Sequence, residues 1–171
     1  MKNKKLLSLI LAFIIILFQN NFVNTEEFNF ETSQIDLLEN GNVIKGSQGT
    51  KITTKEIEIL ADKFEYNKES FILKAKGNIV INDLKNNVIF QTNSLLYNKK
   101  IEKIFFKEFI EASIENRIFV ESNNLTYNRN STDIVSNEQT KIQDDNNNFF
   151  SIKEFVFNLD KELLKGKDIK F

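Results

Sequence analysis

The titratable side chains of this sequence limit the chemistry that it could perform. The chain has 171 residues, with no histidine and no cysteine. It therefore lacks the commonest general base and any thiolate nucleophile. Catalysis would need a pair of carboxylates or a Lys/Ser pair instead. Carboxylates such as Glu65 and Asp83 fall at strand positions that we expect to face water, so we predict no catalytic site, no cofactor and no enzyme.

The densest group of oxygen ligands is Asp144–Asn148, which reads Asp-Asp-Asn-Asn-Asn. A carboxylate-rich loop of this kind can bind calcium. This one lacks the alternating ligand spacing and the glycine of an EF-hand loop. We interpret it as a polar loop and predict no metal site.

The N-terminus has the composition of an export signal. Three lysines among the first five residues precede Leu6–Phe18, an apolar run of 13 residues interrupted only by one serine. A helix that spans a bilayer needs about 20 residues, so this length favours a secretory signal peptide over an uncleaved anchor. We expect residues 1–24 to be the signal peptide, cut near Asn24, and residues 25–171 to be the mature domain.

The charge of the mature chain argues against a nucleic-acid partner. Loss of the three leader lysines changes the formal net charge from −1 to −4. No cluster of Lys or Arg is interleaved with the aromatic residues. Neutralising phosphates requires such a cluster.

A short aromatic pattern recurs along the mature chain. Tyr66, Tyr97, Tyr127 and Phe157 follow one another at intervals of 31, 30 and 30 residues, and Asn with a basic residue follows each tyrosine. A fixed period of this length indicates a repeat protein. Apolar residues within each copy alternate with a period of two, which is typical of a strand with one buried face. We predict an all-β antiparallel repeat stack with rungs of about 30 residues, each made of two or three short strands.

Several positions predict turns or irregular strands. Asn40-Gly41 predicts a type I′ turn in a hairpin over residues 35–46, and Gly46–Gly49 predicts a second turn. Gly77-Asn78 predicts a bend or bulge inside a strand, and a change of apolar parity predicts another bulge near Leu60-Ala61. Ile104–Ile110 does not alternate, which is typical of a strand buried on both faces or of a surface that contacts a partner.

The end of the sequence continues the strand pattern. Leu163–Phe171 resembles Leu73–Ile81, displaced by about one residue. The chain stops inside this pattern without a polar capping repeat. Either the last strand is an edge for a partner, or the sequence is the front of a longer protein.

Together, the signal peptide, the repeated Tyr-Asn-Lys rungs and the phrase Ala75–Ile81 (Ala-Lys-Gly-Asn-Ile-Val-Ile) resemble the organic-solvent-tolerance-like domain. This family includes the periplasmic bridge protein of lipopolysaccharide transport and the N-terminal part of the outer-membrane lipopolysaccharide-assembly protein. The resemblance covers about residues 35–171. It implies a V-shaped β-jelly roll with an apolar interior that carries acyl chains.

The resemblance also implies partners and a location. They are lipopolysaccharide, other jelly-roll transport proteins joined through edge strands, and an outer-membrane β-barrel in the same or another chain. The expected location is the periplasm, in association with the outer membrane. Two departures from the family are the absence of cysteines and of a following barrel sequence.

The repeat aromatics and their strand neighbours allow two interpretations, an ordinary core or the lining of a lipid slot. A surface β-solenoid adhesin or a structural repeat protein without lipid cargo is the alternative to a carrier. The candidate lipid-binding residues are Phe64, Tyr66, Phe71, Leu73, Ile79, Ile81, Phe90, Leu95, Tyr97, Leu125, Tyr127, Phe155 and Phe157.

Overall fold

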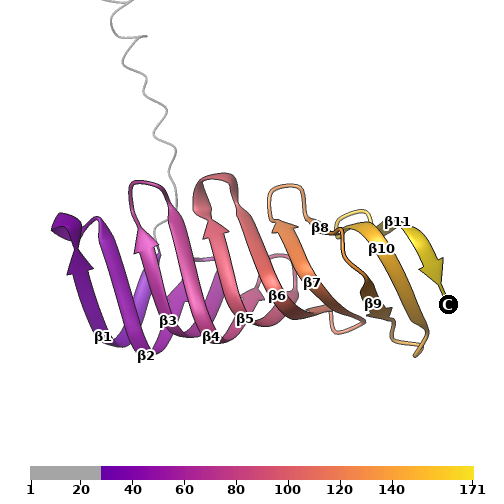
Figure 1. Ribbon diagram of the computed structural model, residues 1–171, viewed down its shortest axis with the longest axis horizontal. Helices are drawn as coiled ribbons and strands as arrows, with labels where there is room; N and C mark the ends of the chain where they lie inside the picture. Colours follow the sequence, from indigo (N-terminus) through magenta and orange to yellow (C-terminus); the bar gives the residue numbers. More distant parts are fainter. Residues whose placement is uncertain (1–27) are drawn as a thin grey trace, which may run out of the picture.

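The structure, a computed structural model, describes residues 28–171. The predicted signal peptide and its cleavage position near Asn24 lie outside the described residues. Residues 28–171 form one 11-stranded antiparallel sheet. Figure 1 shows its strands side by side along the long axis of the molecule, in chain order from β1 to β11. The predicted all-β repeat stack is confirmed.

The elements have the following bounds. The strands are β1 (Asn29–Leu38), β2 (Val43–Thr53), β3 (Ile57–Asn67), β4 (Ile72–Asp83), β5 (Val88–Asn98), β6 (Lys103–Ile114), β7 (Ile118–Asn128), β8 (Asp133–Ser136), β9 (Thr140–Gln143), β10 (Phe149–Asn158) and β11 (Leu163–Lys170). Two 3-10 turns lie between strands, η1 (Glu39–Gly41) and η2 (Lys99–Ile101).

Each central repeat consists of two strands, within the predicted two or three, but the strands are long and not short. Strands β3 to β6 have 11 or 12 residues each. The breaks in alternation that suggested extra turns are bulges, and antiparallel pairing continues on both sides of them. Two predicted bulges are confirmed, because the β3–β4 register shifts between Leu60 and Lys63 and the β4–β5 register between Lys76 and Ile79.

Two turn predictions need correction. Gly46–Gly49 is not a turn, because it lies inside β2, where the register with β3 shifts between Ser47 and Thr50. Gly49, with φ of +81°, lies within this bulge, whereas Gly46 pairs with Phe64 before it. The hairpin at Asn40-Gly41 does form, but four residues connect Leu38 to its partner Val43. Positive φ extends over residues 39–41, so the connection is longer than a two-residue type I′ turn.

The bulges bend the strands, so the sheet folds over into two layers. Figure 1 shows one half of the sheet in front and fainter strand segments behind it. Phe30 belongs to the cross-strand row of Ile52 and Ile59, which lies in the first half of β3. Its ring nevertheless stacks on Phe64, in the second half of β3, at 4.6 Å between centroids. Strands β8 and β9 are two halves of one such bent strand, because both pair with β7 and with β10.

The core lies between the two layers and consists of rows of cross-strand pairs, the unit of stabilisation in a sheet. The row in one layer is Ile44, Tyr66, Leu73, Tyr97, Ile104, Tyr127, Ile134 and Phe157. The row in the other is Phe30, Ile52, Ile59, Ile81, Phe90, Ala112, Val120, Ile142 and Phe150.

The irregular segment Ile104–Ile110 is also explained by a bulge. The β6–β7 register shifts between Phe106 and Phe109, so Ile104, Phe106 and Ile110 all point inward and are buried. Phe109 is 53% exposed. The segment is therefore not a strand buried on both faces.

Hydroxyl groups satisfy backbone carbonyls at the bend. Thr50 Oγ1 donates to the carbonyl of Ala61, and Thr92 Oγ1 donates to that of Phe109, each at 2.9 Å. A bulge removes ladder hydrogen bonds, and an unpaired buried carbonyl costs free energy. These threonines therefore stabilise the fold line.

The turns gather into two rims along the open side of the folded sheet. The first rim comprises turns 39–42, 68–71, 99–102, 129–132 and 159–162, and the second comprises 54–56, 84–87, 115–117 and 144–148. Backbone hydrogen bonds of 2.9 Å join successive turns within a rim, such as Arg129 N to Glu102 O in the first and Leu84 N to Glu56 O in the second.

Candidate functional site

Most of the predicted lipid-binding residues meet in the interior between the layers. Phe71 lies in a first-rim turn, outside the core cluster, and Tyr66 is partly buried against that cluster. The other members are buried in it: Phe64, Leu73, Ile79, Ile81, Phe90, Leu95, Tyr97, Leu125, Tyr127, Phe155 and Phe157.

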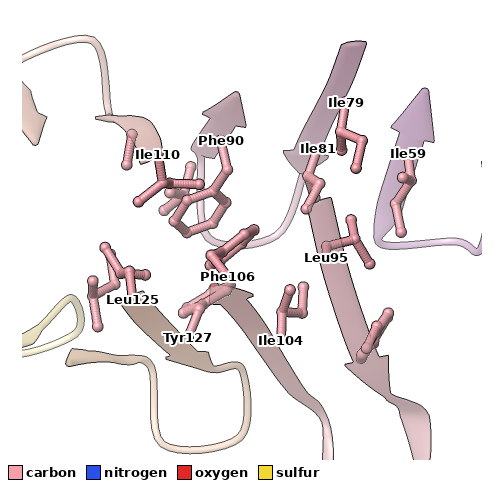
Figure 2. Close-up of a cluster of buried hydrophobic side chains, with 14 of the residues drawn as sticks. Ile59, Ile79, Ile81, Phe90, Leu95, Ile104, Phe106, Ile110, Leu125 and Tyr127 are labelled. Carbon is pink, nitrogen blue, oxygen red and sulfur yellow. The ribbon is translucent and has the colours of Figure 1, made fainter. Parts of the chain in front are cut away.

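These side chains fill the interior in this structure. Figure 2 shows Phe90, Phe106 and Tyr127 gathered from three strands. The ring of Phe90 lies 5.0 Å from that of Phe106 and 5.1 Å from that of Tyr127, between centroids. The arrangement is a packed core whose rows run along the length of the stack. Lipid binding by these residues stays a prediction.

Two aromatic residues beside the first strand fill the N-terminal end of the interior. Phe28 packs edge-on against Tyr66 at 5.2 Å and against Tyr97 at 5.7 Å. Phe30 stacks on Phe64. Their spacing predicts a strand, but only the folding of the sheet places them opposite β3 and β5.

A buried ionic network connects the two rims near the middle of the stack. Its centre is Arg129, in the first rim, whose side chain is 5% exposed. Its guanidinium donates Nε to Asp83 Oδ2 at 2.8 Å and Nη1 to Glu102 Oε2 at 2.6 Å. Nη2 reaches Glu56 Oε2 at 3.3 Å. Glu56 belongs to the second rim and Asp83 ends the strand that leads into it, so one side chain joins both rims.

The prediction that Asp83 faces water is wrong. Its exposed fraction is 0%. Besides Arg129, its Oδ2 accepts hydrogen bonds from Tyr127 Oη at 2.9 Å and from Asn86 Nδ2 at 3.0 Å. A carboxylate can be buried when it is paired and fully hydrogen-bonded. Glu65, by contrast, faces outward as predicted and pairs with Lys45.

The first-rim side of the network contains a second ion pair. Lys99, 6% exposed, donates Nζ to Glu102 Oε1 at 2.6 Å. Tyr97 donates its hydroxyl to Glu102 Oε2 and accepts from Arg129 Nη1 at 3.1 Å. The ammonium of Lys99 also lies 5.8 Å from the ring centroid of Phe28. Such a cation–π contact favours a desolvated cation.

The local charges determine the protonation states. Burial alone would raise the pKa of Asp83, but the hydrogen bond and charge of Arg129 bring it below its ordinary value. The pKa of Glu102 is lowered too, because hydrogen bonds from Lys99 and Tyr97 outweigh its burial. Burial raises the pKa of the Tyr97 and Tyr127 hydroxyls. Both carboxyls are therefore charged and both tyrosines protonated near neutral pH.

The network is electrically balanced. Arg129 and Lys99 offset Asp83 and Glu102, and Glu56 also pairs with Lys85 at 3.3 Å. Its charged groups are hydrogen-bonded to one another. The arrangement suits holding two edges together better than activating a substrate.

The placement of the tyrosines in the sequence is a signal for this network. The chain has 3 tyrosines against 17 phenylalanines, and all three tyrosines occupy the same place in the repeat, two residues before a basic side chain. A buried Tyr hydroxyl normally finds a hydrogen-bond partner. Tyr at this place, with Lys99 or Arg129 following, therefore indicates a polar site beside the core.

The rims are separated towards the C-terminal end. A cavity of about 210 Å³ lies there, with apolar walls that include Ile114, Ile118, Phe157 and Leu159. Charged residues such as Arg117 and Glu162 surround it. Phe157 is one of the predicted lining residues, so this cavity reaches the edge of the interior.

Residues 28–171 contain no group of three or more acidic side chains placed to hold a metal ion. No helix in the same range combines the length and apolar character needed to cross a bilayer.

No protein-family model matches this chain, and no curated protein sequence matches it. Among solved structures, the chain is similar to the crystal structure of LptH, the LptA-homologous periplasmic component of the conserved lipopolysaccharide transport device from Pseudomonas aeruginosa. The similarity covers 82% of each chain, at 8% sequence identity and a TM-score of 0.33.

Proposed function

We propose that the chain is a non-enzymatic carrier for lipopolysaccharide in the periplasm, with acyl chains held between the two layers. The observation that supports this is the continuity of the interior rows from β2 to β10. The rows also extend to exposed apolar residues on the edge strands, Leu37 opposite Ile44 and Leu164 opposite Phe157. Leu37 is 64% exposed and Leu164 is 38% exposed.

Such an interior needs no catalytic group. Burial of an acyl chain is non-directional and contributes about 25 cal/mol per Å² of apolar surface. Because the rungs have similar composition, the free energy of burying an acyl chain is nearly equal at each position along the stack. For an acyl chain to enter the interior, the two packed layers of the sheet must move apart.

The edge strands are the proposed contacts with other jelly-roll transport proteins. Among the described residues, β1 pairs only with β2 and β11 only with β10. An edge strand with unpaired backbone groups can add a strand from another chain. The resemblance extends the proposal to an outer-membrane β-barrel, in the same or another chain, as the final partner.

A structural repeat protein without cargo is the second candidate. The close packing of Phe90, Phe106 and Tyr127 favours it, because those rings leave the interior filled. A β-solenoid adhesin is less compatible, since such proteins usually stack parallel strands and every pair here is antiparallel.

Photo-crosslinking in cells tests the proposal. A photoreactive residue at Phe64, which is 4% exposed, should capture lipopolysaccharide. The same probe at Glu65 should capture none, because neighbouring residues on a strand point to opposite faces. Leu95, inside, and Leu96, outside, provide a second matched pair. Equal capture at inner and outer positions, or no capture at either, would leave the second candidate.

A further inference from the structure

The buried ionic network lies where the folded sheet would otherwise be open. On the closed side of the fold, the two layers are joined covalently, because the backbone of each strand passes through the bend. Within residues 28–171, the open side has no backbone ladder, because the backbone hydrogen bonds between turns join turns of the same rim. Near the middle of the stack, Arg129 and Tyr127 supply side-chain contacts from one rim to the other. The contacts that end on Asp83 are buried, and those that end on Asn86 and Glu56 are partly buried.

The interior is closed to solvent next to this network and is more open towards β10. Tyr97 and Tyr127 have exposed fractions of 0%, as does Phe90 in the opposite layer. Towards β10, a cavity of about 440 Å³ lies between the second-rim residues Asn86 and Glu115 and the first-rim residues Leu159 and Lys161. Across that part of the rims, Arg117 pairs with Glu162 at 3.4 Å, and both of these side chains are more than half exposed.

Because the contacts between the rims are ionic, the rims can separate and close again at a lower free-energy cost than apolar contacts would require. A buried salt-bridge network gains Coulomb energy but loses hydration, and the two nearly cancel. If the rims separate, Arg129, Lys99, Asp83 and Glu102 regain water. An apolar seam would expose hydrocarbon instead, which is unfavourable in proportion to its area. Separating the rims here therefore costs less than separating the core.

We propose that this network is a rim latch, formed by Arg129, Asp83, Glu102, Tyr97 and Tyr127, that controls lateral access to the interior. When it is formed, apolar molecules are excluded from the middle of the stack. When it breaks, the two rims separate while the bend keeps the layers connected. The inference concerns access and does not depend on which cargo the interior carries.

The test uses N-phenyl-1-naphthylamine, an uncharged dye that fluoresces in apolar surroundings. Arg129→Gln removes the ionic contacts of Arg129 with Asp83 and Glu56 across the rims. Its rate of dye uptake should exceed that of the unmodified protein by about tenfold or more, as expected when a minor open state becomes well populated. Glu65→Gln is the matched control, since it removes a charge from the outward ion pair with Lys45, and it should leave uptake unchanged.

Two measurements separate opening from unfolding. Arg129→Gln should keep its far-UV β spectrum, and its faster hydrogen exchange should be confined to rim amides such as Leu84 and Glu115. Unchanged uptake in a folded Arg129→Gln variant would overturn the proposal.

A cross-linked variant decides the question if Arg129→Gln does not fold. The chain has no cysteine, so Glu56→Cys with Asn130→Cys places a unique thiol on each rim. Joining them with a bismaleimide should reduce dye uptake by about tenfold relative to the same variant left unlinked. Equal uptake before and after linking would show that access does not require the rims to separate. Because the dye is not lipopolysaccharide, either result is independent of the cargo experiment.

Discussion

At the scale of single residues, Tyr127 shows how one side chain belongs to both the core and the latch. Its ring contacts Phe90 in the interior, while its hydroxyl donates to Asp83 and accepts from Asn86 Nδ2 at 2.7 Å. Phenylalanine would fill the same space without these bonds. The choice of Tyr therefore reflects the polar contacts and not the packing alone.

Tyr127→Phe should lower the free energy of unfolding by about 1–3 kcal/mol, because Asp83 would lose a donor inside the protein. Urea unfolding followed by far-UV circular dichroism measures the change. Phe157 is the equivalent position in the last repeat, and Phe157→Leu provides a control for ring packing without a hydroxyl. An unchanged unfolding midpoint for Tyr127→Phe would mean that its hydroxyl contributes nothing to the network.

At the scale of the strand, the bulges determine the shape of the molecule. In β4 the bend falls at Gly77 and Asn78, with φ of +80° and +46°. A Cβ on Gly77 would lie 2.2 Å from Asp62 Oδ2, on the neighbouring strand. Both the backbone angle and the close approach therefore require glycine at this position.

Gly77→Ala should destabilise the protein by about 1–3 kcal/mol, since it adds backbone strain and a steric contact. The matched control is Lys76→Ala, which changes the preceding exposed residue of the same strand. Thermal unfolding of the two variants measures the difference. Equal midpoints would contradict the assignment of a constrained bulge.

At the scale of the whole molecule, the network predicts how stability depends on pH. Asp83 and Glu102 have lowered pKa values in the folded chain, relative to ordinary values of 3.8 and 4.5. Below about pH 5 the unfolded chain therefore binds more protons than the folded one, and the folded state loses stability as the pH falls. Above that range these two groups contribute a constant stabilisation.

The urea midpoint should stay level from pH 7 to about pH 5 and then fall with acidification. The double variant Asp83→Leu/Arg129→Leu replaces the buried ion pair with two apolar side chains and keeps the Lys99–Glu102 pair. Its midpoint should fall less steeply over the same acid range. Identical slopes would show that exposed carboxylates, and not the buried network, cause the acid sensitivity.

The period of the aromatic pattern was enough to predict the all-β antiparallel stack, because strand alternation and repeat length are local properties of the sequence. The bulges at Leu60-Ala61 and Gly77-Asn78 were also predictable, since a parity change and a glycine are visible in the chain. The same local pattern predicted shorter strands than those of the central repeats and placed a turn at Gly46–Gly49. A break in alternation does not reveal whether pairing resumes beyond it.

Only the tertiary structure decided what lies across the fold. Asp83 and Arg129 are 46 residues apart, and they meet because the bent sheet brings opposite ends of its strands together. The same folding turned Asp83 from an expected water-facing carboxylate into a buried partner of Tyr127. Strand alternation assigns each side chain to a face of the sheet, but burial depends on what covers that face. That information comes from strands distant in sequence, and for this reason the rim latch could not be derived from the chain alone.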